Sequence, residues 1–238
     1  MSYKAIYESA KLNPEKFWME AANQVDWIKP PSKALFDNNS PFYEWFSDAE
    51  VNTCFNAVDR HVIAGNGKQT AIIYDSPITG KKSKTSYLDL QEQTSKLGGL
   101  LRKQGVKKGD RIIIYMPMIP EAIVAMLACA RIGAIHSVVF GGFAANELAT
   151  RIDDCTPKVI LAGSCGIEPS GVIAYKPLID KAIEIANHKP DNCIIYQRET
   201  LQAELIEGRD LDWVKAQDGI IPVECEKMNG SDPAYILY

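Results

Sequence analysis

Two stretches of the sequence place glycine, lysine and a hydroxyl side chain in the order that phosphate-binding loops use. They read Gly67-Lys68-Gln69-Thr70 and Gly80-Lys81-Lys82-Ser83. The full pattern needs a further glycine five residues before the glycine that precedes lysine, and those positions hold Val62 and Asp75. The second stretch also lies within an expected hairpin and does not precede a helix. We therefore exclude both stretches as nucleotide sites.

Asp59, Arg60 and His61 place an acid, a base and an imidazole side by side. Neighbouring residues of a helix point in different directions, so a structural ion pair or helix cap explains the triplet better than a catalytic role. His136 and His188 are far apart and show no ligand spacing. We assign no metal site.

A glycine pair, Gly141-Gly142, follows an expected strand and lies between two phenylalanines, Phe140 and Phe143. By composition alone a glycine pair indicates a plain turn. In a parallel sheet, however, ligands gather at the carboxyl ends of the strands. Residues 140–143 are therefore a candidate binding corner, and residues 164–171 form a second loop rich in Gly, Ser and Pro.

The segments around this corner predict a strand, a helix and a second strand. Residues 112–116 are a short apolar run of the kind that lies buried on both faces. Pro120 suits the first turn of a helix, and residues 123–132 are apolar nearly all round, which indicates a buried helix. Residues 135–140 form the second strand. Such a crossover implies a parallel sheet.

The rest of the chain repeats this alternation. We expect further strands at 71–75, 85–87, 158–163 and 193–197, and further helices at 87–104, 144–154 and 177–187. Residues 71–75 and 85–87 form the hairpin, and residues 201–213 are expected to be peripheral. The order predicts an α/β fold with a doubly wound, mostly parallel sheet and helices on both faces.

Residues 1–58 predict an irregular, mostly helical lead-in. Asn13 suits a helix cap and Pro14 the first helical position. The segment is rich in aromatic residues, among them Trp18, Trp27, Trp45, Phe17, Phe36, Phe42 and Phe46. The favoured interpretation is that these rings pin an extension onto a larger body. A peptide-binding surface is the alternative.

Composition and charge argue against some classes of partner and indicate a cellular compartment. The chain has 238 residues and a formal net charge of −4, and it contains no long basic block, which argues against nucleic acid or an anionic membrane as a partner. The N-terminus has no apolar signal core. No C-x-x-C pair occurs among the cysteines, which favours a reducing cytoplasm over a disulfide framework. The cysteines are Cys54, Cys129, Cys155, Cys165, Cys193 and Cys225.

Five stretches together resemble one enzyme family. They read W-F at 45–46, N-x-x-x-N-x-x-D-R-H at 52–61, Y-M-P-M-I-P-E-A at 115–122, M-L-A-C-A-R-I-G-A-I-H-S-V-V-F-G-G-F at 126–143 and S-C-G-I-E-P at 164–169. The chain is similar throughout to the N-terminal part of a short-chain acyl-CoA synthetase, of the acetyl-CoA/propionyl-CoA synthetase group among adenylate-forming enzymes. S-C-G-I-E-P followed by A-Y-K-P-L is more similar to the propionyl-CoA branch.

The resemblance implies a two-step ligase reaction for the complete enzyme. A short carboxylate, acetate or propionate, is activated by ATP and Mg2+ to an acyl-adenylate, and coenzyme A then takes the acyl group. It also implies two regions: residues 1–58 as the N-terminal extension of the acetyl-CoA synthetase type, and residues 59–238 as the first part of the AMP-binding large domain. In the family, the strand corresponding to 232–238 runs into the loop that holds the ATP phosphates.

For coenzyme A the resemblance implies two contact segments. These are Phe140-Gly141-Gly142 and Glu168-Pro169-Ser170-Gly171. Glycines suit the first because backbone must approach the ligand closely. Family members commonly carry an arginine, suited to a phosphate, where this chain has Gly171. This departure calls the phosphate contact into question and leaves weaker coenzyme A binding, or binding through another cation, as the alternatives.

The ATP and Mg2+ sites and all catalytic residues are expected beyond Tyr238, so residues 1–238 alone are expected to be inactive. A non-catalytic module that binds coenzyme A or docks a protein is the alternative, and a generic nucleotide-binding α/β domain is a weaker one. The last strand, near residues 235–238, would leave an exposed edge, which predicts self-association.

Overall fold

The computed structural model describes residues 2–238, and its centre is a six-stranded sheet. The strand order is β12-β11-β8-β6-β7-β14, and every neighbouring pair is parallel. The strands are β6 (Arg111–Met116), β7 (Ile135–Phe140), β8 (Val159–Gly163), β11 (Asn192–Tyr196), β12 (Asp210–Asp212) and β14 (Tyr235–Ile236). The predicted α/β class is confirmed.

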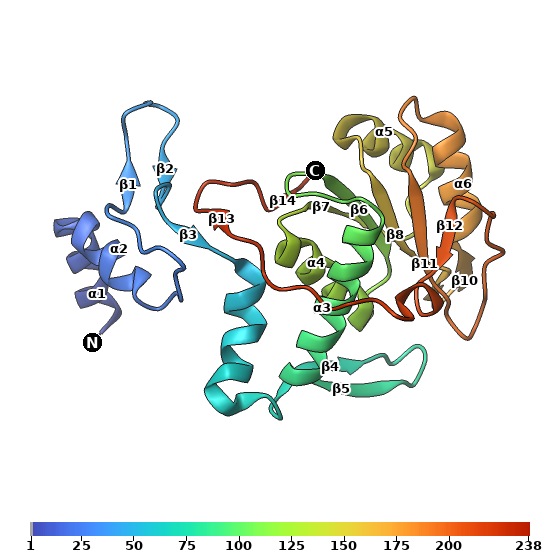
Figure 1. Cartoon of the computed structure of the whole chain (residues 1–238), viewed down its shortest axis with the longest axis horizontal. Coiled ribbons are helices and arrows are strands. Elements are labelled where there is room, and N and C mark those ends of the chain that lie inside the picture. Colours follow the sequence, from blue (N-terminus) through green and yellow to red (C-terminus); the bar gives the residue numbers. More distant parts are fainter. Residues whose placement is uncertain (1) are drawn as a thin grey trace.

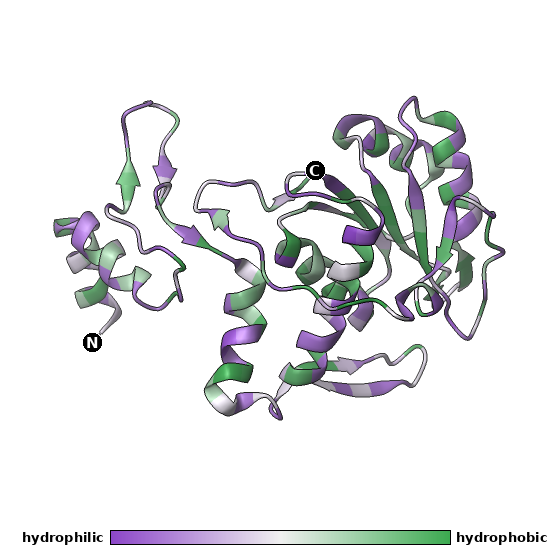
Figure 2. Cartoon of the chain, in the orientation of Figure 1, coloured by the Kyte–Doolittle hydropathy of each residue, from purple (hydrophilic) through white to green (hydrophobic). Residues whose placement is uncertain are grey.

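Side chains of β6 alternate between two hydrophobic clusters. Ile112 and Ile114 join one cluster and Ile113 and Tyr115 the other, and all four are fully buried. Successive strand residues point to opposite faces, so a continuous apolar run is what a strand covered on both faces requires. Figure 2 shows hydrophobic residues concentrated on these central strands.

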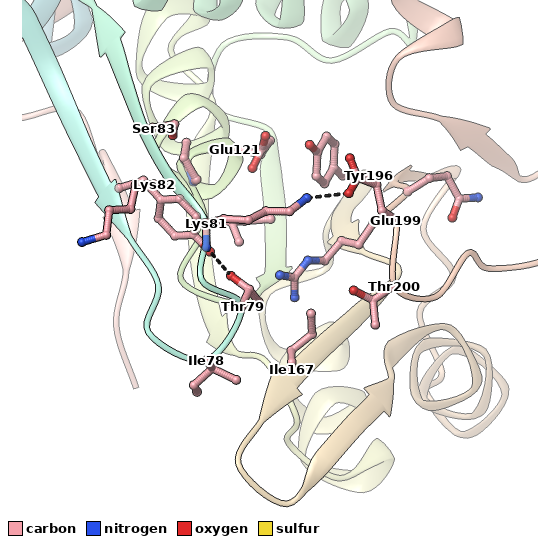
Figure 3. A pocket seen from close by; sticks show the side chains of 15 residues that line it. Ile78, Thr79, Lys81, Lys82, Ser83, Glu121, Ile167, Tyr196, Glu199 and Thr200 are labelled. Atoms are coloured by element: carbon pink, nitrogen blue, oxygen red, sulfur yellow. Dashed lines mark hydrogen bonds and ion pairs between the residues drawn. The ribbon is translucent and has the colours of Figure 1, made fainter.

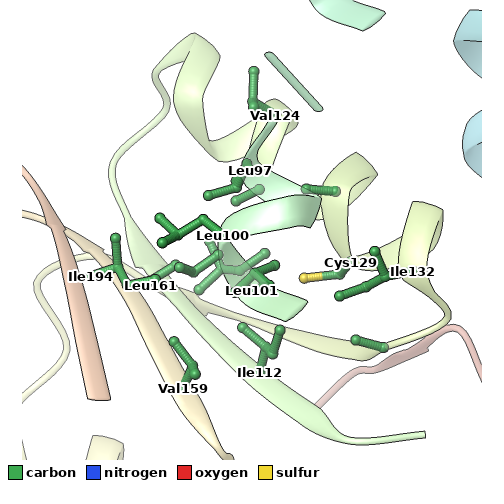
Figure 4. Packing of buried hydrophobic residues seen from close by; sticks show 14 of the residues in the cluster. Leu97, Leu100, Leu101, Ile112, Val124, Cys129, Ile132, Val159, Leu161 and Ile194 are labelled. Carbon is green, nitrogen blue, oxygen red and sulfur yellow. The ribbon is translucent and has the colours of Figure 1, made fainter. Parts of the chain in front are cut away.

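One face of the sheet is covered by α3 (Tyr87–Lys103) and α4 (Pro120–Ile132). Leu97, Leu100 and Leu101 of α3 pack onto β6, β8 and the buried side of α4 (Figure 4). The helices begin and end as their sequences indicate, with a Ser86–Asp89 capping box on α3 and Gly133 in the left-handed conformation after α4.

The other face is covered by α5 (Ala145–Cys155) and α6 (Tyr175–Ile185), as Figure 1 shows. Leu148 and Ile152 of α5 and Ile179 of α6 are fully buried there. The predicted helices on both faces are therefore confirmed.

The N-terminal part lies at one end of the molecule, away from the sheet (Figure 1). It contains α1 (Tyr3–Leu12), α2 (Pro14–Ala22), β1 (Leu35–Phe36) and β2 (Glu44–Trp45). Its aromatic rings pack on one another: the Trp18 and Trp45 ring centroids are 5.4 Å apart, and those of Trp27 and Phe46 are 5.6 Å apart. Trp18 and Trp45 nevertheless remain 42% and 45% exposed.

A segment near the C-terminal end of the sequence connects the N-terminal part of the chain to the helices α3 and α4. Residues 220–227, here called the strap, cross α3 and α4 before β13 (Met228–Asn229) pairs with β3 (Glu50–Val51) (Figure 1). The Val223 amide donates to the Ser95 carbonyl at 3.1 Å. A Cβ on Gly99 would collide with the carbonyl oxygen of Ile221, so glycine permits this close crossing.

Several elements differ from the sequence prediction. Residues 164–171 are not an irregular loop, because most of them form the hairpin β9 (Cys165–Glu168) and β10 (Gly171–Ala174). The segment 201–213 supplies β12, followed by the short helix η3 (Lys215–Gln217). The sequence of residues 51–62 predicts a helix that leads into the main domain; the helix found there includes two π-helical stretches, η1 (Phe55–Asp59) and η2 (Val62–Asn66), and so runs beyond residue 62.

The expected hairpin is present as β4 (Thr70–Asp75) and β5 (Lys82–Ser86). Its return strand is longer than predicted because Lys82, Ser83 and Lys84 also pair. Across residues 2–238, none of the helices combines the length and the apolar character needed to cross a bilayer.

Candidate functional site

The carboxyl ends of three neighbouring strands meet at one edge of the sheet. β6 ends at Met116, β7 at Phe140 and β8 at Gly163. β7 and β8 are consecutive strands of this sheet in chain order, yet they lie on opposite sides of β6. Such a reversal of strand order opens a crevice at the carboxyl ends, where α/β folds bind ligands.

The corner after β7 is held by two tyrosines. The Tyr115 hydroxyl donates to the Phe143 carbonyl at 2.8 Å and accepts from the Gly142 amide at 3.1 Å. A Cβ on Gly141 would collide with the Tyr175 hydroxyl, and Gly142 has φ of +103°, which glycine adopts without strain. Both glycines are therefore required by the corner itself.

Both tyrosines keep their protons at neutral pH. Burial raises the pKa of Tyr115, and burial together with the neighbouring Tyr115 raises the pKa of Tyr175 to about 12. Their ring centroids lie 4.9 Å apart. They are neutral hydrogen-bonding and packing groups that set the shape of the corner.

The second predicted segment is the turn of the β9–β10 hairpin, and it lies beside the corner. A Cβ built on Gly142 would be 3.8 Å from the Glu168 carboxylate oxygen Oε1. Pro169, Ser170 and Gly171 are exposed. The structure thus brings the two sequence-predicted segments together at one edge, with their glutamate facing the glycine pair.

Gly171 has a backbone conformation that glycine favours. Its φ is +137°, and no atom lies within 4 Å of a Cβ built there. A side chain at this position would therefore meet no other atom, but the backbone of any residue other than glycine would be strained at this φ. An arginine at this position, as the resemblance leads one to expect, would need a different turn.

Two adjoining cavities open beside the corner. The first, about 270 Å³, is lined by Phe140, Gly141 and Glu168 among others, and the second is about 560 Å³. They share the lining residues Tyr74, Ile78, Thr79, Ile119, Ile167 and Arg198. Arg198 therefore borders both spaces.

Cations from two elements line the larger cavity (Figure 3). Lys81 and Lys82 come from the β4–β5 hairpin, and Arg198 follows β11. The Lys81 ammonium lies 2.6 Å from the Glu199 carboxylate, but these side chains are 59% and 84% exposed, so the pair is weak. A phosphate could replace Glu199 as the partner of Lys81.

Sequence reasoning missed Arg198 and took Lys81 only as part of a rejected phosphate loop. Arg198 comes just after the end of a parallel strand, and the carboxyl-end rule was the available signal for it. Residues 80–83 lie in the β4–β5 hairpin, as predicted, and do not precede a helix.

Asp59 has a structural partner, as its sequence context indicates. Its carboxylate accepts two hydrogen bonds from Arg131, at 2.8 and 2.9 Å, and one from Gln91 at 2.8 Å. Burial alone would lower the pKa of Arg131, and the bonds to Asp59 raise it. Arg60 donates to the Gln24 carbonyl at 2.9 Å. The side chains of Asp59 and Arg60 therefore point in different directions.

Folding also gathers groups that the sequence leaves far apart. The sulfur atoms of Cys54 and Cys225 and a carboxylate oxygen of Asp59 lie within 4.8 Å of one another. The sequence gives no metal-ligand spacing here, because Cys225 arrives from the strap.

Comparison with known families gives two matches. The model described as AMP-binding enzyme matches residues 59–238, and the model described as acetyl-coenzyme A synthetase N-terminus matches residues 3–57. Together they span nearly the whole chain.

Several curated proteins are similar along the whole chain. Acyl-CoA synthetase short-chain family member 3, mitochondrial, from Rattus norvegicus is 50% identical over 237 residues, covering 99% of this chain and 35% of the relative. An acetyl-coenzyme A synthetase from Marinomonas sp. (strain MWYL1) is 39% identical over 242 residues, covering 99% of this chain and 37% of the relative. The chain thus spans little more than a third of these relatives' length.

A solved structure shares the fold. Acetoacetyl-CoA synthetase from Streptomyces lividans superposes with a TM-score of 0.87 at 22% identity, covering 100% of this chain and 36% of the other.

Proposed function

Because the chain belongs to the AMP-binding enzyme family, we propose that it is the N-terminal part of an AMP-forming short-chain acyl-CoA synthetase. In this proposal the complete enzyme uses ATP and Mg2+ to activate propionate or acetate and transfers the acyl group to coenzyme A. Residues 1–58 are its N-terminal extension, and residues 59–238 begin its AMP-binding domain. The observation that carries the proposal is identity of 50% to a named acyl-CoA synthetase along 99% of the chain.

The role we assign to this chain is to hold the nucleotide end of coenzyme A. Phe140, Gly141 and Gly142 offer a ring and closely approachable backbone, and the Glu168–Gly171 turn lies beside them. The 3′-phosphate and diphosphate of coenzyme A require cations, and Gly171 supplies none. Arg198 borders the same cavity and Lys81 the adjoining one, so they are the cations that fit.

Arg198→Ala is expected to weaken coenzyme A binding by about tenfold or more, because a hydrogen bond between charged groups contributes about 1.5–3 kcal/mol. Lys81→Ala should give a smaller loss, since its ammonium is more exposed. Isothermal titration of coenzyme A measures both. Lys84→Ala is the matched control, because Lys84 is on the same hairpin and lines neither cavity. Equal affinities for the Arg198 and Lys84 variants would remove Arg198 from the site.

Residues 1–238 alone are expected to release no AMP from ATP in the presence of propionate, or acetate, and coenzyme A, because the resemblance puts the ATP and Mg2+ groups beyond Tyr238. A protein extended to the length of the relatives should release AMP in the same assay. Comparing propionate with acetate on that longer protein decides the acyl substrate. Carboxylate-dependent AMP release by residues 1–238 would contradict this assignment.

The alternative is a non-catalytic module that binds coenzyme A or docks a protein. Exposed aromatic rings favour it: Trp18, Phe42 and Trp45 are 42%, 73% and 45% exposed. The coding sequence after Tyr238 separates the two proposals. A phosphate-binding loop there supports the ligase, and an immediate stop codon supports the module.

Two further assignments accompany the ligase proposal. β14 lies at the edge of the sheet, and Tyr235, Leu237 and Tyr238 are exposed, so residues 1–238 are expected to self-associate through this edge. A monomeric mass by light scattering at high concentration would contradict that. The cysteine pattern supports a cytoplasmic location, although the rat relative is named as mitochondrial.

A further inference from the structure

Two cysteines meet where the early and late parts of the chain join. Cys54 immediately precedes η1 and is fully buried, and Cys225 lies in the strap and is half-buried. Their sulfur atoms belong to the group of three ligand atoms that lie within 4.8 Å of one another. The third member, Asp59, is held in place by Arg131.

The two sulfurs form hydrogen bonds with different charged groups. Arg131 Nη1 lies 3.6 Å from the Cys54 sulfur and donates to it. The Cys225 thiol has one proton, which it donates either to the Asp59 carboxylate, with its sulfur 3.7 Å from Oδ2, or to the neighbouring Cys54 sulfur. Cys54 is therefore placed to carry negative charge, and Cys225 is placed to keep its proton.

The pKa values of Cys54 and Cys225 shift as this arrangement requires. The hydrogen bond from Cys225, aided by the charge of Arg131, lowers the pKa of Cys54 in spite of burial. The bond to Cys54, together with burial, raises the pKa of Cys225. Burial raises the pKa of Cys155 to about 11 and that of Cys193 to about 12. Thiolates react and neutral thiols do not, so Cys54, although equally buried, differs from Cys155 and Cys193 in the direction of its pKa shift.

We propose that Cys54 and Cys225 form a redox modification site, which a small hydroperoxide converts to an intramolecular disulfide. The Cys54 sulfur attacks the outer peroxide oxygen, the O–O bond breaks, and the leaving alkoxide or hydroxide takes a proton. Cys54 is then a sulfenic acid. The Cys225 sulfur attacks Cys54, passes its proton through Asp59, and releases water. Two thiols are oxidised and one peroxide is reduced to water and an alcohol, or to two waters.

Access to the site and closure of the disulfide both require the strap to move, because backbone hydrogen bonds at Val223 and Glu226 hold it on either side of Cys225. Its residues are irregular in conformation, and Glu224 beside Cys225 is exposed. A disulfide requires the sulfurs to approach to about 2.0 Å, which rotation of both side chains and a small shift of the strap can supply. Cys54 is fully buried and Cys225 only half-buried, so in this proposal a small peroxide reaches Cys54 when the strap moves away from it.

The same three ligand atoms could be considered for a metal ion. Arg131, however, occupies both Asp59 carboxylate oxygens and places its positive charge among the three groups. A divalent cation would have to displace this guanidinium, whereas the guanidinium favours a thiolate. The arrangement therefore suits oxidation better than metal binding.

The experiment treats the native protein with hydrogen peroxide, blocks free thiols, and maps peptides without reduction. We expect a cross-linked peptide pair containing Cys54 and Cys225, two hydrogens lighter than the free pair. We also expect a higher midpoint of thermal unfolding, which falls back on reduction, because the cross-link closes a long loop. Cys155→Ala is the matched control and should leave the cross-link unchanged.

Two variants test the roles of the sulfurs. In Cys225→Ser, dimedone should trap a sulfenic acid on Cys54, because the resolving thiol is gone. In Cys54→Ser, dimedone should label Cys225 at background level. The proposal is overturned if the wild-type protein yields Cys54 and Cys225 as free thiols under peroxide that oxidises its methionines. It is also overturned if Cys225 is the residue trapped. The wild-type map needs no variant, so poor folding of either one leaves the test decisive.

Discussion

Asp59→Ala is expected to lower the free energy of unfolding by about 3–5 kcal/mol, because it leaves the Arg131 guanidinium buried without its partner. The two side chains are 5% and 3% exposed, so water cannot replace the carboxylate. Arg131 also donates to the Val223 carbonyl of the strap at 2.6 Å, and the loss should therefore loosen the strap. Urea unfolding followed by circular dichroism measures the change.

A matched control and a double variant separate the effect of the unpaired buried charge on stability from the effect of lost packing. Asp37→Ala removes an acid from the exposed Lys33–Asp37 ion pair and should leave stability nearly unchanged. Asp59→Leu combined with Arg131→Met should recover much of the loss, because an apolar pair leaves no charge unpaired. If Asp59→Ala and Asp37→Ala unfold at the same urea concentration, the buried pair is not a structural anchor.

Gly141→Ala is expected to weaken coenzyme A binding by about tenfold or more, at a cost in stability of about 1–3 kcal/mol. The added methyl would meet the hydroxyl and two ring carbons of Tyr175, the carbons at 2.8 Å. Either the corner or Tyr175 must move, and the binding backbone moves with it. Titration calorimetry with coenzyme A and thermal unfolding report the two effects separately.

Gly67→Ala is the matched control for this prediction. A Cβ there meets its nearest atoms at 3.6 Å, an ordinary contact, and Gly67 has a helical backbone conformation. It should leave both measurements near those of the parent. An unchanged dissociation constant for Gly141→Ala would remove the glycine pair from the coenzyme A site, even if its stability fell.

The central strand, helix and strand could be predicted because local signals agree there. The apolar run 112–116 predicts the strand and Pro120 the start of α4, and the structure has both where they are expected. β12 was missed because Asp-Leu-Asp carries no strand signal and pairs only through tertiary context. The 164–171 hairpin was taken as a loop because its glycines and proline resemble turn residues.

The candidate site was predictable in part for the same reason. Residues 140–142 follow a strand and carry a glycine pair, so local rules and the family resemblance identify the same corner. Arg198 and the tyrosines behind the glycines depend on contacts between distant segments. Cys54 and Cys225 are a clearer case, because each looks like an isolated cysteine until the strap is placed.

The strap also sets an order of assembly. Asn52 donates to the Glu226 carbonyl at 2.8 Å across a separation of 174 residues, and closing such a long loop is entropically costly. As the chain leaves the ribosome, α3, α4 and the inner strands exist before the strap does. Residues 52–59 can bond to α3 and α4 earlier, but their contacts with the strap must wait for it, and we expect their amides to exchange with solvent sooner than those of β6. The junction would be the last part of the molecule to close and the first to open.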